Sequence, residues 1–130
     1  INQIDKLDQI CKIRNKNFKL YNEALSDVMP YIKYSKDVSN FAYPVICQNR
    51  DKIIKDLSRN KIEARPLICG SMGSQPFYIK NYGRKTLPNS SIIDRYGFYI
   101  PNHPELTEKQ ILKISSIIKE NKWKRQSSQG

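Results

Sequence analysis

Histidine and cysteine are scarce in this chain, and their scarcity argues against several kinds of site. There is one histidine, His103, and the three cysteines, Cys11, Cys47 and Cys69, have no C-x-x-C spacing. Structural zinc sites need four such ligands, so we expect no metal site. The number of cysteines is odd and each has apolar neighbours, which favours reduced thiols in a cytoplasmic protein over a disulfide framework.

Long hydrophobic runs and acidic residues are also few. No apolar run reaches the length that spans a bilayer, and no secretory signal pattern is visible, so we expect no membrane association. There are 23 lysines and arginines against 12 acidic residues, which gives a formal net charge of +11 and favours anionic partners. The cations are scattered and no nucleic-acid-binding signature is present. The sequence therefore favours a solvated, lysine-rich surface over nucleic-acid binding.

The length suits one domain or a piece of one, and a long helix is predicted at its start. Apolar residues recur at three- and four-residue spacing from Ile4 to Leu25, which predicts an amphipathic helix over about residues 2–26. The chain begins inside this pattern without a methionine, so we expect a fragment in which residues 1–28 form a long helix. Residues 29–122 are expected to form a small α+β domain and residues 123–130 a flexible tail.

Further elements follow from periodicity and turn residues. Strands are predicted at 41–47, 62–68 and 98–101, and Pro44 places the first at a sheet edge or a bulge. A short strand could also lie within 30–40. Helices are predicted at about 50–60, 76–83 and 87–94, and from Thr107 with a Thr107–Gln110 capping box.

This order predicts an α+β fold with a small sheet of about three strands and helices mainly on one face. The apolar stripe of the first helix is too long for so small a sheet to cover. We therefore expect another domain or a second subunit to bury part of it.

The segment 62–78 contains a candidate binding loop. A predicted strand runs into a loop with Gly70 and Gly73, which permit backbone angles that other residues resist. Arg65 precedes the loop, and its serines and Gln75 can place donors around an anionic or hydroxyl-rich ligand. An ordinary strand-to-loop turn is the alternative that these residues leave open.

Four segments together carry a family resemblance over all but about the last seven residues. They are Ile1–Leu7, Arg14–Phe18 with an Arg-x-x-Asn pattern, Asn60–Tyr78 with I-E-A-R-P and Q-P-F-Y, and Leu87–Thr107. In this order they resemble the C-terminal part of the DegT/DnrJ/EryC1/StrS family. That family contains sugar aminotransferases and keto-sugar dehydratases that depend on pyridoxal phosphate (PLP). One departure is Ala64, where threonine is common.

The resemblance implies the C-terminal small domain of a fold-type-I PLP enzyme, with residues 1–28 as the long helix that links it to the missing large domain. The whole enzyme would be a cytoplasmic homodimer that aminates a nucleotide-linked keto-sugar in amino-deoxysugar, polysaccharide or surface-glycan biosynthesis. A keto-sugar 3-dehydratase of the same family is the alternative. In the aminotransferases a lysine forms a Schiff base with PLP, and in the dehydratases a histidine replaces it. No lysine here lies in a matching motif, so we assign no catalytic residue, and the isolated chain is expected to be inactive and to bind no PLP.

By position in the family, substrate binding is assigned to six residues: Arg65, Ser71, Ser74, Gln75, Tyr78 and His103. A guanidinium such as that of Arg65 matches phosphate geometry, although an ion pair with Glu63 or Asp94 is equally open. The two serines and Gln75 can donate to sugar hydroxyls or a diphosphate, and Gln75 can instead cap the next turn.

The last two candidates have structural alternatives as well. Tyr78 can stack on the nucleotide or pack with Phe77 in the core. His103 can act as an acid or base, or serve only the turn before the last helix. Outside the family, two readings stay open: a non-catalytic basic module for RNA or acidic polymers, and a scaffold fragment without a ligand.

Overall fold

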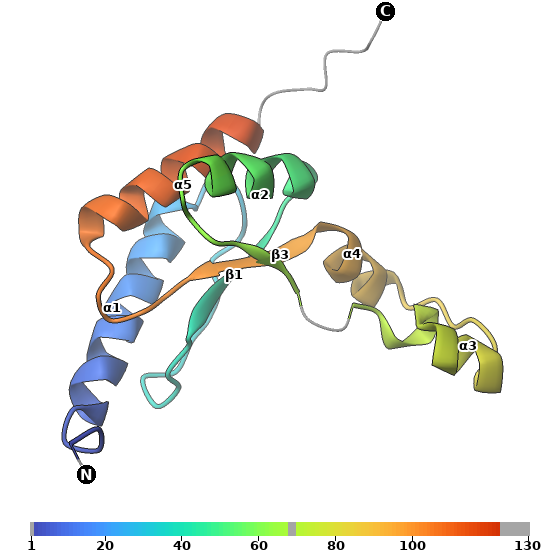
Figure 1. Cartoon of the computed structure of the whole chain (residues 1–130), viewed down its shortest axis with the longest axis horizontal. Helices are drawn as coiled ribbons and strands as arrows, with labels where there is room; N and C mark the ends of the chain where they lie inside the picture. The colour runs from blue at the N-terminus through green and yellow to red at the C-terminus, as the bar shows by residue number, and fades with distance from the viewer. Residues whose placement is uncertain (1, 68–69, 123–130) are drawn as a thin grey trace, which may run out of the picture.

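The computed structural model describes residues 2–67 and 70–122 and has the predicted α+β fold (Figure 1). The helices are α1 (Leu7–Ala24), α2 (Arg50–Arg59), the 3-10 turn η1 (Met72–Ser74), α3 (Pro76–Tyr82), α4 (Pro88–Tyr96) and α5 (Glu108–Lys122). The strands are β1 (Ala42–Ile46), β2 (Arg65–Pro66) and β3 (Gly97–Pro101).

The three strands form one antiparallel sheet in the order β1-β3-β2. Tyr43 lies opposite Ile100, Val45 opposite Phe98, and these four side chains are fully buried. β1 is an edge strand, as Pro44 predicted, because proline cannot donate to a second neighbour. The intervening residues of β1 and β3 reach the other face of the sheet, because strand side chains alternate between faces.

Helices α1, α2 and α5 cover the buried face of the sheet. α5 contacts both α1 and α2, and the three helices supply most of the core together with the two longer strands. The core residues of the helices are Phe18, Tyr21, Ile53, Leu57, Ile111, Ile114 and Ile118, and Leu25, which directly follows α1, joins them. This layer confirms the predicted arrangement of helices mainly on one face.

Helix α1 is buried along its second half only. It begins at Leu7 rather than at residue 2, because residues 2–6 form turns. Ile4 and Leu7 are 74% and 55% exposed, whereas Phe18 and Tyr21 are buried. The helix is thus part of the core of this domain, and its apolar stripe continues beyond the sheet, while the domain boundary at residue 28 stays a prediction.

Buried polar side chains fix α1 to the end of β3. Asn17 Nδ2 donates to the carbonyl oxygen of His103 at 3.3 Å, and the Tyr21 hydroxyl donates to that of Pro101 at 2.8 Å. Asn102, which is fully buried, donates through Nδ2 to the carbonyl oxygens of Arg14 and Asn40. The Arg-x-x-Asn pattern therefore includes an asparagine with a structural role.

Helix α5 begins with the predicted capping box. Thr107 N donates to Gln110 Oε1 at 2.9 Å, and Gln110 N donates to Thr107 Oγ1 at 3.2 Å. Both bonds pair a backbone N–H group that would otherwise have no partner at the start of a helix.

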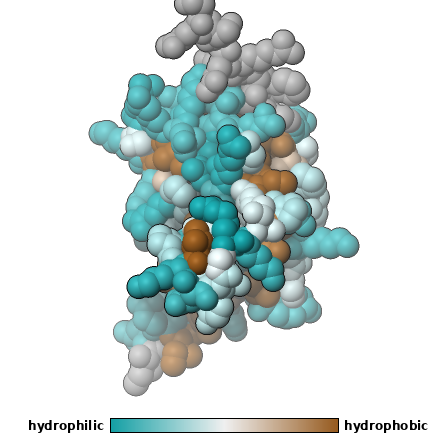
Figure 2. All heavy atoms as spheres, turned by 90° about the vertical axis from the view of Figure 1, so that its right-hand side faces the viewer, coloured by the Kyte–Doolittle hydropathy of each residue, from teal (hydrophilic) through white to brown (hydrophobic). Residues whose placement is uncertain are grey.

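Residues 71–96 form an arm that projects from the end of the sheet (Figure 1). The arm comprises η1, α3 and α4, and it joins the sheet where α4 runs directly into β3. Arg50 Nη1 donates to the Asp94 carbonyl oxygen at 2.6 Å, and Leu67 N donates to that of Gly97 at 3.2 Å. Viewed from the end of the arm, hydrophilic side chains cover most of the surface, and apolar ones show as small separate patches (Figure 2).

Two strand predictions were wrong in extent. β2 contains only Arg65 and Pro66 rather than 62–68, because Ile62 and Ala64 pack against the core beside α2 without joining the sheet. Residue 68 and the predicted flexible tail lie outside the described residues. Residues 30–40 contain no strand, since Ile32 is held by both polar atoms of the buried Asn22 side chain.

Candidate functional site

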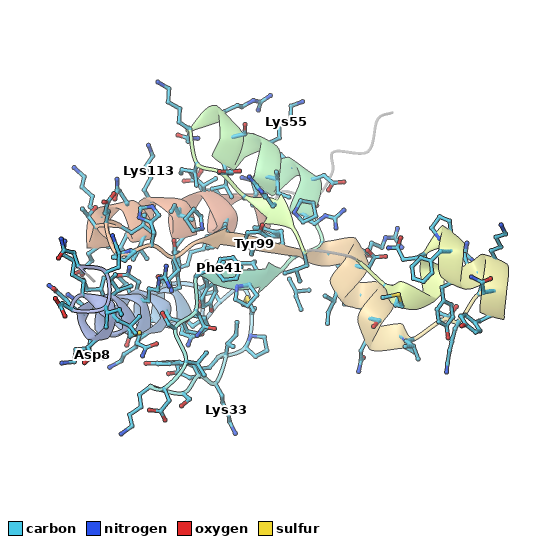
Figure 3. The ribbon with its side chains drawn as sticks, turned by 60° about the horizontal axis from the view of Figure 1, so that its bottom comes forward. Asp8, Lys33, Phe41, Lys55, Tyr99 and Lys113 are labelled. Carbon is cyan, nitrogen blue, oxygen red and sulfur yellow. The ribbon has the colours of Figure 1, made fainter. Side chains whose placement is uncertain are left out.

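The face of the sheet opposite the helices is partly open and aromatic. Phe41 is 66% exposed, and its ring lies 6.1 Å from that of Tyr99 at an angle of 72° (Figure 3). Ala42, Glu63, Arg65 and Pro101 complete a shallow hollow around the two rings. Sequence analysis missed Tyr99, although the alternation of buried and open positions along β3 could have indicated it.

Arg65 lies on this open face and forms an ion pair with Glu63. Its Nε donates to Glu63 Oε1 at 2.7 Å, and Nη2 donates to the same oxygen. The hydrogen bond and the negative charge of Glu63 raise the pKa of the Arg65 guanidinium. Of the two partners considered from the sequence, the structure shows Glu63. A smaller contribution to the raised pKa of Arg65 comes from Tyr99, which lies opposite Arg65 in the sheet.

The two loop glycines are required by the packing of the arm. Gly70 has φ +56°, and a Cβ there would collide with the Asp94 carboxylate. Gly73 is buried, and a Cβ there would collide with the Lys85 carbonyl oxygen. Lys85 N also donates to Gly73 O at 3.1 Å, so the loop before α3 is tied to the turn before α4.

The candidate residues Ser71, Ser74, Gln75 and Tyr78 lie together on η1 and the start of α3. Ser71 is 2% exposed, and its Oγ has no hydrogen-bond partner among the described residues. Ser74 N donates to Ser71 O at 3.0 Å, and Gln75 is the N-cap residue of α3. A buried hydroxyl is normally hydrogen-bonded, so a ligand or water that reaches Ser71 Oγ would find a donor and acceptor there.

Tyr78 packs within the arm rather than in the core. Its ring lies 5.0 Å from that of Tyr82 and 6.5 Å from that of Phe77. Phe77 is 55% exposed, so the alternative in which Phe77 and Tyr78 form core is wrong. The three rings make an aromatic surface on α3, which can accept a planar group by stacking.

His103 lies apart from the arm. It follows β3 at the end of the strand farthest from α4, its side chain is exposed, and its carbonyl oxygen accepts hydrogen bonds from Asn17 and from Leu106 N. The structure thus groups four candidates on the arm, places Arg65 on the sheet between them and His103, and does not bring His103 to the arm.

The DegT/DnrJ/EryC1/StrS aminotransferase family model matches residues 1–119. The chain belongs to this family. The fold agrees with solved structures of DegT-family proteins. An aminotransferase of the family from Brucella abortus is 25% identical, with a TM-score of 0.79 over 95% of this chain and 34% of that one.

Two further solved structures share the fold. The E coli GDP-4-keto-6-deoxy-D-mannose-3-dehydratase, with bound hydrated PLP, is 20% identical over 90% of this chain and 33% of that one, with a TM-score of 0.75. The sugar aminotransferase CalS13 from Micromonospora echinospora is 17% identical over 90% and 32%, with a TM-score of 0.76. This DegT-family chain therefore spans about a third of the length of the solved structures that it matches. No curated protein matches it.

Every lysine whose side chain is described here reaches solvent, whereas burial away from water is one way in which a lysine that bonds a carbonyl group is activated. Within the same residues, no three or more metal-binding side chains gather around a common point. Nor does any helix of residues 2–67 and 70–122 have the length and apolar composition to cross a membrane.

Proposed function

We propose that this chain is the substrate-binding small domain of a PLP-dependent enzyme that aminates a nucleotide-linked keto-sugar. The observation that carries the proposal is the family match over residues 1–119, and the shared fold over 90–95% of the chain supports it. PLP supplies the electron sink for amino transfer when bound. In this proposal, residues outside these 130 hold PLP, and the residues here bind and orient the sugar nucleotide.

The arm and the open face of the sheet divide this task. Arg65 offers its guanidinium to a phosphate oxygen, while Glu63 holds the guanidinium in place through Nε and Nη2. Ser71, Ser74 and Gln75 supply polar groups at one end of the arm for sugar hydroxyls or the diphosphate. Tyr78 lies one turn further along and supplies an aromatic face for the base.

Amination and dehydration differ in the product, so one assay separates the two family reactions. The whole protein that carries this chain is incubated with PLP, glutamate and nucleotide-linked 4-keto-sugars, and the products are identified by mass spectrometry. We expect a product in which an amino group replaces the keto oxygen. Loss of a hydroxyl group as water would instead establish the dehydratase, which the E coli neighbour favours. If no tested keto-sugar reacts, the proposal is wrong.

The non-catalytic alternatives make a different prediction. A basic module would bind RNA or acidic polymers with an affinity that falls steeply with salt. We expect no such binding, because the lysines and arginines that give the +11 charge are scattered along the chain and no nucleic-acid-binding signature accompanies them. Homodimer formation and a cytoplasmic location stay predictions, and the elution volume of the whole protein tests the first.

A further inference from the structure

A groove of about 460 Å³ lies at the end of β3, on the side away from the arm. It is formed by the loop between α2 and β2, by the end of β3 and by the first two turns of α5. Its lining residues are Asn60, Lys61, Ile62, Glu63, Pro101, His103, Leu106, Gln110, Lys113 and Ile114. Small-molecule sites typically measure about 300–1,000 Å³, so this hollow has the size of a ligand site.

The floor of the groove is apolar and fixed by the core. Ile114 is 2% exposed and belongs to the core, and Ile62 and Leu106 pack against it. Together with Pro101 they offer a flat apolar surface that the packed core beneath holds in position. A ligand with an apolar or aromatic part would therefore bury it here without rearrangement of the chain.

The rim of the groove is cationic. Lys61, Lys113 and His103 border it, and neither lysine forms an ion pair within the part of the chain that the structure describes. The one acidic residue of the rim, Glu63, is already paired with Arg65. The local charge at the groove is therefore positive, and it is complementary to an anion.

One backbone feature and one side-chain feature determine which polar groups the rim presents. Lys61 has φ +60°, a left-handed conformation that is uncommon for residues other than glycine and costs free energy. A hydrogen bond from Lys61 N to Ser58 O, at 2.9 Å, closes this turn and holds Lys61 in that conformation. Gln110 uses Oε1 for the capping box, which leaves its amide Nε2 without a partner among the described residues. The rim thus offers two ammonium groups and an amide donor.

We propose that this groove binds an organic phosphate, with the phosphate between Lys61 and Lys113 and the apolar part on the floor. Two ammonium groups with an added amide donor suit a phosphate dianion, because charge-assisted hydrogen bonds to its oxygens are the strong ones. The groove lies apart from the arm residues, and Glu63 and Pro101 line both it and the hollow that contains Arg65. The groove gives His103, which lies too far along β3 to join the arm residues, a role as a fourth donor.

Methyl NMR of the whole protein tests the site directly, because two isoleucines line the groove. With ¹³C-labelled isoleucine δ1 methyl groups, assigned through Ile62→Val and Ile114→Val, phenyl phosphate is titrated in. We expect saturable shifts of the Ile62 and Ile114 methyl groups, and unchanged signals for Ile46 and Ile92, which lie elsewhere. Inorganic phosphate should bind about tenfold more weakly because it lacks the apolar part, and phenol should give no saturable shift.

Two double lysine variants test whether the groove lysines bind the phosphate directly or whether only the general positive charge of the protein attracts it. Lys61→Gln with Lys113→Gln should weaken phenyl phosphate binding at least about tenfold, the loss expected when charge-assisted bonds are removed. Lys52→Gln with Lys55→Gln removes the same charge from α2 outside the groove, and should change affinity less than about twofold. Figure 3 shows Lys55 on α2 and Lys113 on α5. Equal weakening by both pairs, or no saturable shift at Ile62 and Ile114, would overturn the proposal.

Discussion

At the scale of single residues, two tyrosines join α1 to the sheet. Tyr21 and Tyr43 are fully buried and stack with ring centroids 5.0 Å apart. Tyr21 donates its hydroxyl hydrogen to Pro101 O, and Tyr43 donates to Asn22 Oδ1 at 2.8 Å. Burial of the hydroxyl raises the pKa of Tyr43 to about 12 and raises that of Tyr21 further, since a buried phenolate would lose its hydration.

These tyrosines should make the protein less stable at alkaline pH. An unfolded tyrosine ionises near pH 10.0, whereas the folded ones keep their protons to higher pH. Above pH 10 the unfolded state therefore binds fewer protons, and each tyrosine lowers the free energy of unfolding by up to about 1.4 kcal/mol per pH unit. Urea unfolding in a series of buffers from neutral to alkaline pH measures this slope.

Two phenylalanine variants give the controls for this pH dependence. Tyr43→Phe should flatten the alkaline slope, at a cost of about 0.5–1.5 kcal/mol at neutral pH for the lost hydrogen bond. Tyr82→Phe should leave the slope unchanged, because Tyr82 is 75% exposed. An equal slope in all three proteins would show that Tyr43 does not contribute to the effect.

Arg65 gives a residue-scale prediction for the proposed function. Arg65→Gln should raise the KM for the sugar nucleotide about tenfold, a loss of about 1.4 kcal/mol, because one charged contact to phosphate is removed. The kcat should change little, since Arg65 does not contact the reacting carbon in this proposal. Steady-state kinetics of the whole enzyme provide the measurement.

Arg59→Gln is the matched control. Arg59 also forms an exposed ion pair, with Asp56 at 2.9 Å, but it lies at the end of α2 away from the open face. The KM of the Arg59→Gln enzyme for the sugar nucleotide should equal that of the unchanged enzyme. A similar rise of KM in both variants would contradict a specific role for Arg65.

At the scale of elements, the start of α5 depends on local side chains. Thr107→Ala removes the Oγ1 acceptor for Gln110 N, and we expect a loss of about 0.5–2 kcal/mol in the free energy of unfolding. Chemical denaturation measures this loss. Thr86→Ala is the control, because Thr86 is exposed like Thr107 and precedes α4 without a capping bond. A loss as large in Thr86→Ala would indicate a general threonine effect.

The arm should respond to substitution separately from the core. Gly73→Ala would force a methyl group against the Lys85 carbonyl oxygen, so η1 and the turn before α4 must separate. We expect faster hydrogen exchange across residues 71–96 and little change in β1 and α5, since the arm meets the sheet where α4 contacts β3. Met72→Ala, at an exposed neighbour, should leave exchange unchanged. Unaltered exchange in Gly73→Ala would show that the loop tolerates this shift.

The elements most readily predicted from the sequence are those whose cause is local. The capping box of α5, the edge position of β1 and the stop of α4 at Gly97 each depend on residues within a few positions. The arm needed more than this, because its position depends on the Arg50–Asp94 bond between residues 44 apart. The position of His103 also could not be predicted from nearby residues, because its separation from Ser71 follows from the direction of β3.

At the scale of the whole molecule, the proposal that residues outside these 130 hold PLP predicts how the chain and the whole protein differ in PLP binding. The 130-residue chain mixed with PLP and then dialysed should retain no absorbance from bound PLP, because its described lysines are in solvent. The whole protein, treated in the same way, should retain it. Retention by the 130-residue chain would contradict the proposed location of the cofactor.

The central position of β3 also governs how the chain can fold during its synthesis. Both β1 and β2 pair with β3 rather than with each other, and α1 packs on α5, which joins residues that lie far apart in sequence. A ribosome releases β1 and α1 long before Gly97–Pro101 and Ile111–Ile118 emerge. Until then Phe18, Tyr21 and Tyr43 can pack on one another but lack β3 and α5 to complete their burial, so the growing chain exposes aromatic surface that favours aggregation. Late closure of the core would make this domain a natural client for chaperones that bind nascent chains.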